Sequence, residues 1–368
     1  MKICLLTGAS EPEFSTNGGV RHGLKKLGHE VWTVGPAYSY GGKPINKIAD
    51  VELPDRPHIE YYAYDEVLKT CPWTPDFFLC VEPHGYFNGH HFIPSAFYAT
   101  DQHRAGSLYT KVLREGNYDI QFIGQPNYFN LLKGFAKESH IVLPGFDERR
   151  FEKGPDGDVE MWLGNPIVDV SFIGQTGIAE MVYPYHDGMG TYATEAPLNL
   201  PTNPMKRYQF ANSYSFDYAE RAEYLIRLSR DFSVRMYTDV WKSEHFRWAL
   251  QAGRVGFNHS ILHDISIRCF EVMAAGRWLI TDNVSPYVEG FLKDGINCNL
   301  YDSPYKVFFG NFDIAYYRLA TMIEWALSRP FDLGEAEQLR RDAFSKHTWT
   351  KRAEKMVEHM ERYIGSAS

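Results

Sequence analysis

The residues with the clearest chemical potential lie between positions 255 and 301, where short apolar runs alternate with helix-like segments. Glu271 is the strongest single candidate, because the helix predicted over 264–277 is rich in apolar residues around it. A buried carboxylate needs a polar partner, and the hydroxyl groups of a sugar or a ribose would supply one. We therefore expect Glu271 to hold a hydroxyl-rich ligand.

Arg268 lies three residues before Glu271, on nearly the same face of the predicted helix. Its planar guanidinium would place two donors against a diphosphate. An ion pair with Glu271 is an equally good interpretation of the spacing. Ser266 and Asp264 are both candidates for the residue that caps the start of this helix.

The elements around these residues place them at one edge of a sheet. Strands are predicted over 255–258, ending in Asn258, and over 278–282, ending in an acid. In open α/β sheets, ligands bind outside the carboxyl ends of the strands, where helix N-termini favour anionic groups. This arrangement suits a nucleotide-sugar, with Asn258 and Ser266 as candidates for base and phosphate contacts.

The first half begins with another strand–loop–helix unit. A strand over 2–8 leads into a loop that closes at Gly18 and Gly19, just before a helix predicted over 20–28. Glycines let backbone N–H groups approach a diphosphate or an acceptor closely. A tight turn with no ligand is the alternative interpretation.

Asp101 and His103 follow the apolar run 95–100, at the end of a predicted strand. An acid beside a histidine at a strand end can share or move a proton, so we expect one of the two near the acceptor hydroxyl. Capping of the next loop and helix is the alternative. Gly174 ends the strand predicted within 168–177 and is expected to line the ligand cleft or to form a plain turn.

The run from Asn258 to Gly276, N-x5-D-x-S-x-R-x-F-E-x-x-A-x-G, followed by LITD, resembles the C-terminal half of GT-B glycosyltransferases. It is most similar to the CgeB-like, or spore-maturation-like, branch related to the family 4 transferases. The resemblance covers the chain well from about Val168 onward and more loosely before it. It implies an α/β fold of two Rossmann-like domains facing across a cleft, with a C-terminal helix that crosses back to the first domain.

The resemblance also implies roles for particular residues. In family 4 transferases the second Glu of E-x7-E binds the donor ribose, and Glu271 occupies that position. The first Glu is replaced by His263, which leaves open the group that holds the donor sugar; Asp264 is the neighbouring acid. Tyr287 falls where a related glycine-rich turn contacts the donor. Kinship with family 4 further implies retention of anomeric configuration.

Length and composition fit a two-domain enzyme. The chain has 368 residues, which exceeds the size of most single cores. We place an N-terminal acceptor domain at 1–160, a donor domain at 168–340 and a helix that packs back at 341–368. The segment 145–158 is charged and rich in Gly and Pro, and is interpreted as the approach to the linker.

Other compositional features narrow the function classes. The net charge of −8 argues against a broad nucleic-acid surface, and the basic clusters at 21–26, 149–153 and 340–355 are interpreted as solvated faces. The five cysteines are scattered and indicate small buried hydrophobic residues in a reducing, cytoplasmic compartment. No segment has the pattern of a signal peptide or a membrane span. Without a metal-ligand spacing around them, the loop histidines His84, His90 and His91 do not predict a metal site.

The favoured function is therefore a metal-independent glycosyltransferase with no permanently bound cofactor. It would move a sugar from a nucleoside diphosphate sugar to an acceptor hydroxyl on a glycan, a small molecule or a hydroxymethylated DNA base. The DNA-base version rests on the resemblance to phage-type CgeB-like enzymes. A non-catalytic binding or spore-coat-type protein is the alternative, since His263 departs from the motif. A Rossmann oxidoreductase is disfavoured because no G-x-G-x-x-G opens the first helix.

Overall fold

The computed structural model describes residues 1–7, 15–36, 49–53, 62–81, 92–100, 110–152, 164–174, 191–193, 216–237, 243–260, 264–284, 291–302 and 312–367. Contacts divide the chain into two compact units. The first consists of Met1–Asp147 with His347–Ser368, and the second of Glu148–Lys346.

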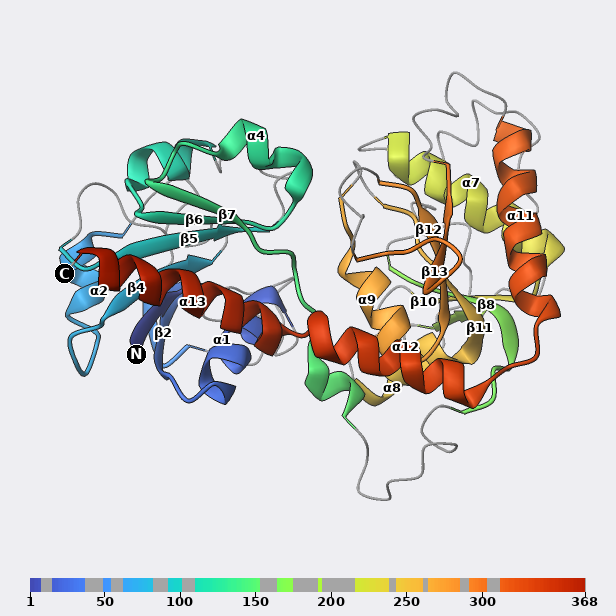
Figure 1. Ribbon diagram of the computed structural model, residues 1–368, viewed down its shortest axis with the longest axis horizontal. Helices are drawn as coiled ribbons and strands as arrows, with labels where there is room; N and C mark the ends of the chain where they lie inside the picture. The colour runs from blue at the N-terminus through green and yellow to red at the C-terminus, as the bar shows by residue number, and fades with distance from the viewer. Residues whose placement is uncertain are drawn as a thin grey trace. The chain divides into compact units, whose positions relative to one another are not determined.

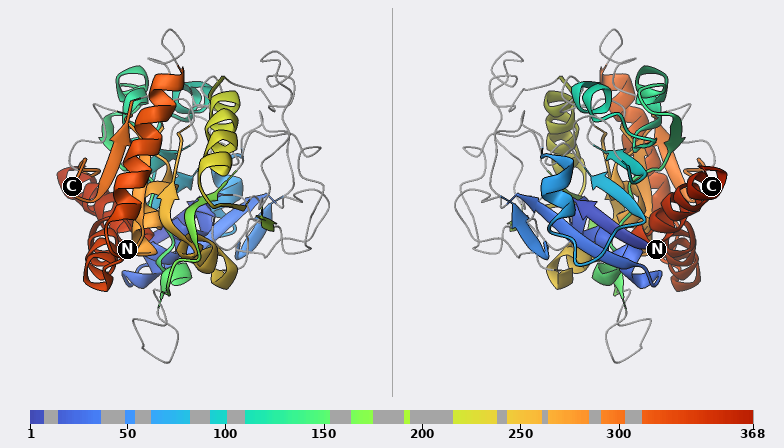
Figure 2. Two further views of the ribbon diagram at one scale, coloured as in Figure 1. Left: turned by 90° about the vertical axis from the view of Figure 1, so that its right-hand side faces the viewer. Right: turned by 90° about the vertical axis from the view of Figure 1, so that its left-hand side faces the viewer.

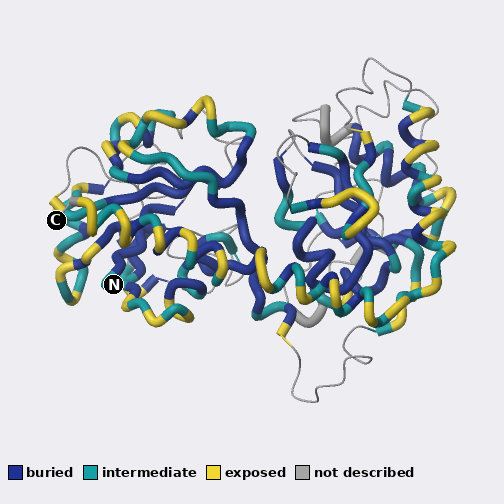
Figure 3. Tube along the Cα trace, viewed as in Figure 1, coloured by how far each residue is buried: buried dark blue, intermediate teal, exposed yellow. Residues whose placement is uncertain are grey.

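The first unit is built on a seven-stranded parallel sheet, in the order β3-β2-β1-β4-β5-β6-β7 (Figure 1). Its strands are β1 (Lys2–Leu6), β2 (Glu30–Pro36), β3 (Val51–Leu53), β4 (Phe77–Val81), β5 (Ser95–Ala99), β6 (Ile120–Ile123) and β7 (Glu138–Ile141). The central strands β1, β4, β5 and β6 carry almost only apolar residues and are buried, as the dark blue tube in Figure 3 shows. Such runs are typical of parallel strands that are covered on both faces.

Short helices connect these strands. They are α1 (Thr16–Lys26), α2 (Tyr64–Leu68), the 3-10 turn η1 (Pro126–Tyr128) and α4 (Phe129–Leu132). Ser15 caps α1 by accepting a hydrogen bond from the Gly18 amide at 3.2 Å. The helix therefore begins at Thr16, before the position 20 that the sequence predicted, because a serine hydroxyl satisfies one of its free amides. This corrects the prediction for Gly18 and Gly19, which lie inside the first turns of the helix and not in a loop.

The C-terminal helix α13 (Trp349–Ala367) belongs to the first unit, where it packs against α1. Backbone hydrogen bonds fasten its entry: the Phe146 amide donates to His347, and the Trp349 amide donates to Phe146. The buried guanidinium of Arg352 donates to the Pro144 carbonyl at 3.3 Å. The predicted return of the last helix to the first Rossmann-like unit is thereby confirmed.

The second unit has a six-stranded sheet in the order β13-β12-β11-β8-β10-β9, in which only the edge strand β9 is antiparallel among the described pairings. The strands are β8 (Val168–Ile173), β9 (Thr191–Ala193), β10 (Val234–Tyr237), β11 (Gly253–Phe257), β12 (Trp278–Asp282) and β13 (Cys298–Tyr301). Strands β8, β11 and β12 confirm the strands predicted within 168–177, over 255–258 and over 278–282. Their ends differ from the predicted ends by a few residues at most.

Helices cover both faces of this second sheet. They are α7 (Phe216–Asp231), α8 (Ser243–Ala252), α9 (Ile267–Ala274), α11 (Phe312–Ser328) and α12 (Leu333–Lys346). Figure 1 shows α7 and α11 on one face and α8, α9 and α12 on the other, and Figure 2 shows α7 beside α11. The 3-10 turn η2 (Glu148–Phe151) packs against α8, so residues 148–152 belong with this unit although the sequence assigned them to the first domain.

No helix within the described ranges combines the length and the apolar character needed to cross a lipid bilayer.

Candidate functional site

Helix α9 carries most of the residues that the sequence selected. Its N-cap is Ser266, whose hydroxyl accepts a hydrogen bond from the Arg268 amide at 3.2 Å, which decides between the two predicted caps. The helix ends at Ala274, and Gly276 two residues later adopts φ +69°, a conformation that glycine reaches without a steric penalty. Most of α9 is buried, including Cys269, Phe270 and Glu271.

The Glu271 carboxylate lies between two guanidinium groups. Arg268 Nη1 is 2.5 Å from Oε2, and Arg150 Nη1 is 3.7 Å from Oε1. The three side chains are 5% exposed for Glu271, 10% for Arg150 and 18% for Arg268. Two largely buried guanidinium groups thus face one carboxylate.

Phe246 of α8 brings the two arginines together. Its ring centroid is 3.4 Å from the Arg150 guanidinium carbon and 4.8 Å from that of Arg268. Cations over an aromatic face are attracted by its quadrupole, and more strongly where water is excluded. Phe151, the neighbour of Arg150, packs edge-on against the same ring with centroids 6.0 Å apart.

The cluster retains unused capacity for hydrogen bonds. Within the described part of the chain, Glu271 Oε2 and Arg268 Nε and Nη1 are buried yet form no hydrogen bond. The Arg268–Glu271 contact is therefore an ion pair without hydrogen-bond geometry. Buried polar atoms in this state cost free energy, which a ligand with hydroxyl and phosphate groups would recover.

The carboxyl edge of the sheet beside α9 is closely hydrogen-bonded. The Asn258 side chain donates to Thr281 Oγ1 at 2.9 Å, so this candidate ligand contact joins the ends of β11 and β12. Ser260 donates through its amide and its hydroxyl to the Asp282 carboxylate, at 2.7 and 2.5 Å. This loop is a rigid platform next to the start of α9.

Arg221 of α7 also supports this platform. Its Nε donates to the His259 carbonyl at 3.1 Å, and its Nη2 donates to the same oxygen. The His259 ring in turn contacts the Tyr301 hydroxyl at 2.6 Å. Burial is the main cause that raises the pKa of Tyr301 well above its ordinary value, so this hydroxyl stays protonated.

The structure gathers some of the predicted residues and separates others. Ser266, Arg268 and Glu271 share α9, the buried Asp264 precedes it, and Asn258 lies beside it. Gly174 follows the end of β8, adopts φ +144° and donates its amide to the Tyr237 carbonyl of the neighbouring strand β10, and its place in a ligand cleft stays a prediction. Gly18 and Gly19 belong to the other unit. Asp101, His103 and Tyr287 lie outside the described residues, as do His84, His90, His91 and His263.

Sequence reasoning missed Arg150, Phe246 and Arg221. Arg150 falls in the basic cluster 149–153, which was interpreted as a solvated linker face. That interpretation is wrong for Arg150, whose side chain is stacked and buried. The sequence around Arg150 gives only a weak signal, because this charged run has no hydrophobic periodicity and matches no motif. Only the packing of η2 on α8 places Arg150 near Glu271.

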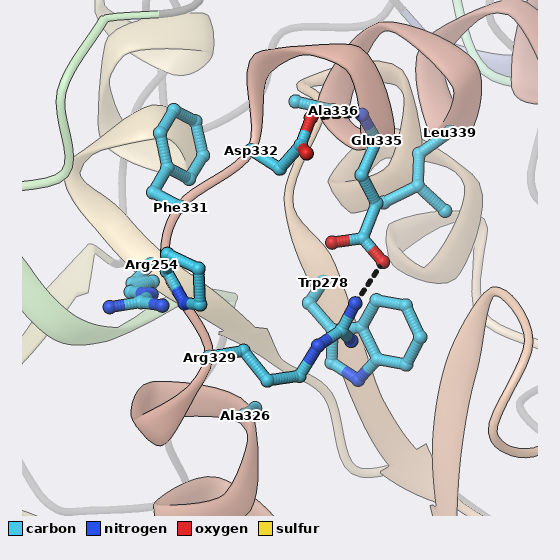
Figure 4. Close-up of a pocket in the computed structure, with 11 residues that line it drawn as sticks. Arg254, Trp278, Ala326, Arg329, Phe331, Asp332, Glu335, Ala336 and Leu339 are labelled. Atoms are coloured by element: carbon cyan, nitrogen blue, oxygen red, sulfur yellow. Dashed lines mark hydrogen bonds and ion pairs between the residues drawn. The ribbon is translucent and has the colours of Figure 1, made fainter.

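A separate small cavity lies at the opposite edge of the same sheet, near the starts of β11 and β12. Figure 4 shows Arg329 directed toward Glu335 beside the Trp278 ring, with Nη2 and Oε1 joined at 2.6 Å. Arg254, Phe331 and Asp332 complete its polar rim and wall. Arg329 and Glu335 already form an ion pair there, and Glu271 is not among the residues that line the cavity. Among the described residues, no group of three or more His, Cys, Asp or Glu is placed to hold a metal ion.

Comparison with known sequences matches part of the chain. Residues 217–358 match a family described as glycosyl transferase-like, a stretch that contains Phe246, Arg268 and Glu271. No curated protein sequence matches the chain.

Solved structures match over nearly the whole length. Sucrose-phosphate synthase from Thermosynechococcus elongatus is 14% identical, with a TM-score of 0.55 and 100% of both chains covered. Anabaena HepE, in complex with UDP and glucose, is 12% identical, with a TM-score of 0.55 over 98% of this chain and 99% of that one. Starch synthase IV from Arabidopsis thaliana, bound to ADP and acarbose, is 11% identical, with a TM-score of 0.55 and 99% of both covered. The likeness establishes the GT-B fold with its two Rossmann-like units, whereas the CgeB-like branch stays a prediction.

Proposed function

We propose that this protein is a glycosyltransferase that moves a sugar from a nucleoside diphosphate sugar to an acceptor hydroxyl. The observation that carries the proposal is the buried Glu271 carboxylate, which faces two guanidinium groups and has an oxygen without a hydrogen bond. It lies within the stretch that matches a glycosyl transferase-like family, in a chain with the GT-B fold.

In this proposal the donor binds with its nucleotide at α9. Glu271 accepts hydrogen bonds from the ribose hydroxyls, which satisfies its buried oxygens. The diphosphate lies near the start of α9, where the helix dipole and the Arg268 guanidinium favour negative charge. The UDP and glucose complex of HepE and the ADP complex of starch synthase IV support a nucleoside diphosphate as the ligand class.

The reaction breaks the bond between the anomeric carbon and the diphosphate oxygen, and forms a bond to the acceptor oxygen. Arg268 and the amides at the α9 N-terminus stabilise the charge that develops on the departing diphosphate, an effect that grows where water is excluded. This chemistry requires no metal. We propose that Asp101 or His103 receives the proton of the acceptor hydroxyl.

The acceptor is proposed to be a hydroxyl of a glycan or a small molecule. A DNA-base acceptor needs cations that contact the phosphate backbone. Three arginines in the basic clusters at 149–153 and 340–355, namely Arg150, Arg340 and Arg352, have buried or largely buried side chains. With a net charge of −8, the chain offers little support for a duplex-binding face.

Two measurements test the proposal. Thermal unfolding with UDP, ADP, GDP and TDP should show stabilisation by at least one of them, because a ligand that binds only the folded state raises its stability. Intact-mass analysis of glycosides and hydroxymethylated oligonucleotides, incubated with the matching nucleotide-sugar, should show a hexose or pentose increment on one acceptor class. A non-catalytic binding protein would give stabilisation without transfer, and no stabilisation by any diphosphate would refute the proposal.

Glu271→Gln is the informative variant. It keeps the size of the side chain and removes its charge. The loss of the ribose contact should weaken the binding of the nucleoside diphosphate by roughly tenfold or more. Glu354→Gln is a matched control, because Glu354 pairs with Lys351 on the exposed face of α13. Equal donor binding by Glu271→Gln and the wild type would remove Glu271 from the site.

A further inference from the structure

Two arginines share the Glu271 carboxylate. Arg150 and Arg268 both lie within ion-pair distance of Glu271, and all three side chains are largely buried. A buried carboxylate is unfavourable unless an opposite charge or strong hydrogen bonds compensate it. One arginine can therefore leave Glu271 without leaving the carboxylate unpaired.

Arg150 is the more firmly held of the two arginines. Its guanidinium carbon lies 3.4 Å from the centroid of the Phe246 ring, the distance of a face-to-face stack. The backbone that follows it is fixed by two further arginines. The Phe151 carbonyl accepts from Arg340 at 3.5 Å, and the Glu152 carbonyl accepts from Arg247 at 3.1 Å.

Arg268 is held much less firmly. It lies in the first turn of α9, is more exposed than Arg150, and its guanidinium carbon is 4.8 Å from the same ring centroid. Its Nε and Nη1 form no hydrogen bond with any described residue, although Nη1 touches the Glu271 carboxylate. A guanidinium with unused donors at a helix N-terminus suits a diphosphate.

We propose that Arg150 is a positioning residue that keeps the Glu271 carboxylate oriented toward the ribose, whereas Arg268 leaves Glu271 and pairs with the diphosphate when the donor binds. This division of roles rests on the proposed function and deepens it. Glu271 then keeps one stacked counter-ion throughout and gains the ribose hydroxyls in place of Arg268. No proton changes hands in this exchange, because both arginines stay charged.

Two affinity ratios separate the roles. The first is the dissociation constant of the 2′-deoxy analogue divided by that of the nucleoside diphosphate, and it reports the ribose contact. The second is the dissociation constant of the nucleoside divided by that of the same nucleoside diphosphate, and it reports the diphosphate contact. The probe is whichever of UDP, ADP and GDP stabilises the wild type most, and dissociation constants are measured by calorimetry or by ligand-dependent unfolding.

Arg150→Gln should reduce the first ratio by about tenfold and leave the second within about twofold. Arg268→Gln should reduce the second ratio by about tenfold and leave the first within about twofold. Arg268→Lys should recover part of the diphosphate ratio, since a lysine also attracts phosphate, but Arg150→Lys should not recover the ribose ratio because an ammonium lacks a planar face to stack. Unfolding curves of each variant check that the fold persists. If Arg150→Gln is too unstable to measure, Arg150→Lys takes its place, since it retains the positive charge but cannot stack.

Arg227→Gln is the matched control. Arg227 also lies over a phenylalanine, Phe312, with 4.8 Å to the ring centroid, and pairs with acids. It belongs to α7, on the other face of the sheet from α8 and α9, so both ratios should stay unchanged. Equal loss of the diphosphate ratio in Arg150→Gln and Arg268→Gln would overturn the division of roles while leaving the proposed function intact. Failure of every diphosphate to bind the wild type would overturn both.

Discussion

Gly19 lies directly against the indole of Trp349. A Cβ atom on Gly19 would be 2.1 Å from Trp349 Cδ1, far inside contact distance. Trp349 is buried, begins α13 and packs edge-on against Tyr98 with ring centroids 6.3 Å apart. The pair lets α13 approach α1 closely and anchors the last helix to the first unit. It also gives Gly19 a packing reason to be a glycine, separate from any ligand.

Gly19→Ala should therefore destabilise the protein. The methyl group must displace the indole, and overpacking of a filled core costs about 1–3 kcal/mol in the free energy of unfolding. Urea denaturation measures this loss. Gly365→Ala in α13 is the control, since no atom lies within 4 Å of its added Cβ and it should be neutral or slightly stabilising. Equal stability of Gly19→Ala and the wild type would show that the two helices are less tightly packed than described.

The contact of α13 with β7 should depend on pH. The rings of His140 and His359 stack with centroids 3.7 Å apart, and Arg362 Nη2 is 3.0 Å from His359 Nδ1. Burial, then the neighbouring His140 and Arg362, lower the pKa of His359 from 6.5 to about 4, against a small opposing effect of Glu358. Glu138 pairs with both His140 and Arg362.

The sign of the effect follows from proton binding. Between pH 6.5 and about 4 the unfolded chain takes up a proton at position 359 before the folded one does. The contribution to stability is therefore complete above pH 6.5 and is lost as the pH falls toward 4. The stability difference between the wild type and His359→Gln, from urea unfolding at several pH values, should shrink over this window. A constant difference would contradict the depressed pKa.

Cys71 should be the reactive thiol. It is the only one of the five cysteines, all of which are described, that is not buried. A hydrogen bond with the Cys4 thiol, and a second with Thr70, lower the pKa of Cys71, whereas burial raises the pKa of Cys298 to about 12. Thiolates react with alkylating agents and thiols do not.

Brief treatment of the folded protein with iodoacetamide should thus add one group by intact mass, and treatment in guanidinium should add five. Cys71→Ser should abolish the native adduct. If the adduct persisted in Cys71→Ser at the same rate, another cysteine would be the accessible one.

Arg277 should be a stability determinant of the second unit. Its side chain is fully buried, with Nε and Nη2 donating to the Gln251 carbonyl at 3.1 and 2.8 Å. Nη2 also donates to the Gly164 carbonyl at 3.0 Å. Arg277→Met keeps the length but removes the donors to both carbonyls, which should cost about 2–4 kcal/mol. Arg341→Met, on the exposed face of α12, should change stability by less than about 0.5 kcal/mol. Chemical denaturation compares the two, and similar values would refute the role of Arg277.

Local patterns in the sequence were sufficient for the parallel strands β8, β11 and β12 and for the key helix of the site. Apolar runs predicted the parallel strands, because burial on both faces leaves little room for polar residues. The spacing of Ser266, Arg268, Glu271 and Gly276 predicted α9, with an arginine and an acid one turn apart. These features depend on neighbours in the chain, so a single sequence contains them.

The tertiary structure alone decided which distant side chains surround Glu271. Arg150 and Phe246 both precede α9 by more than twenty residues, in two separate segments of the sequence, and only the packing of η2 on α8 brings them to the carboxylate. The same holds for Gly19, whose partner Trp349 comes from the far end of the chain. Contacts between remote segments follow from the complementary shapes of buried surfaces, which no local period or motif encodes.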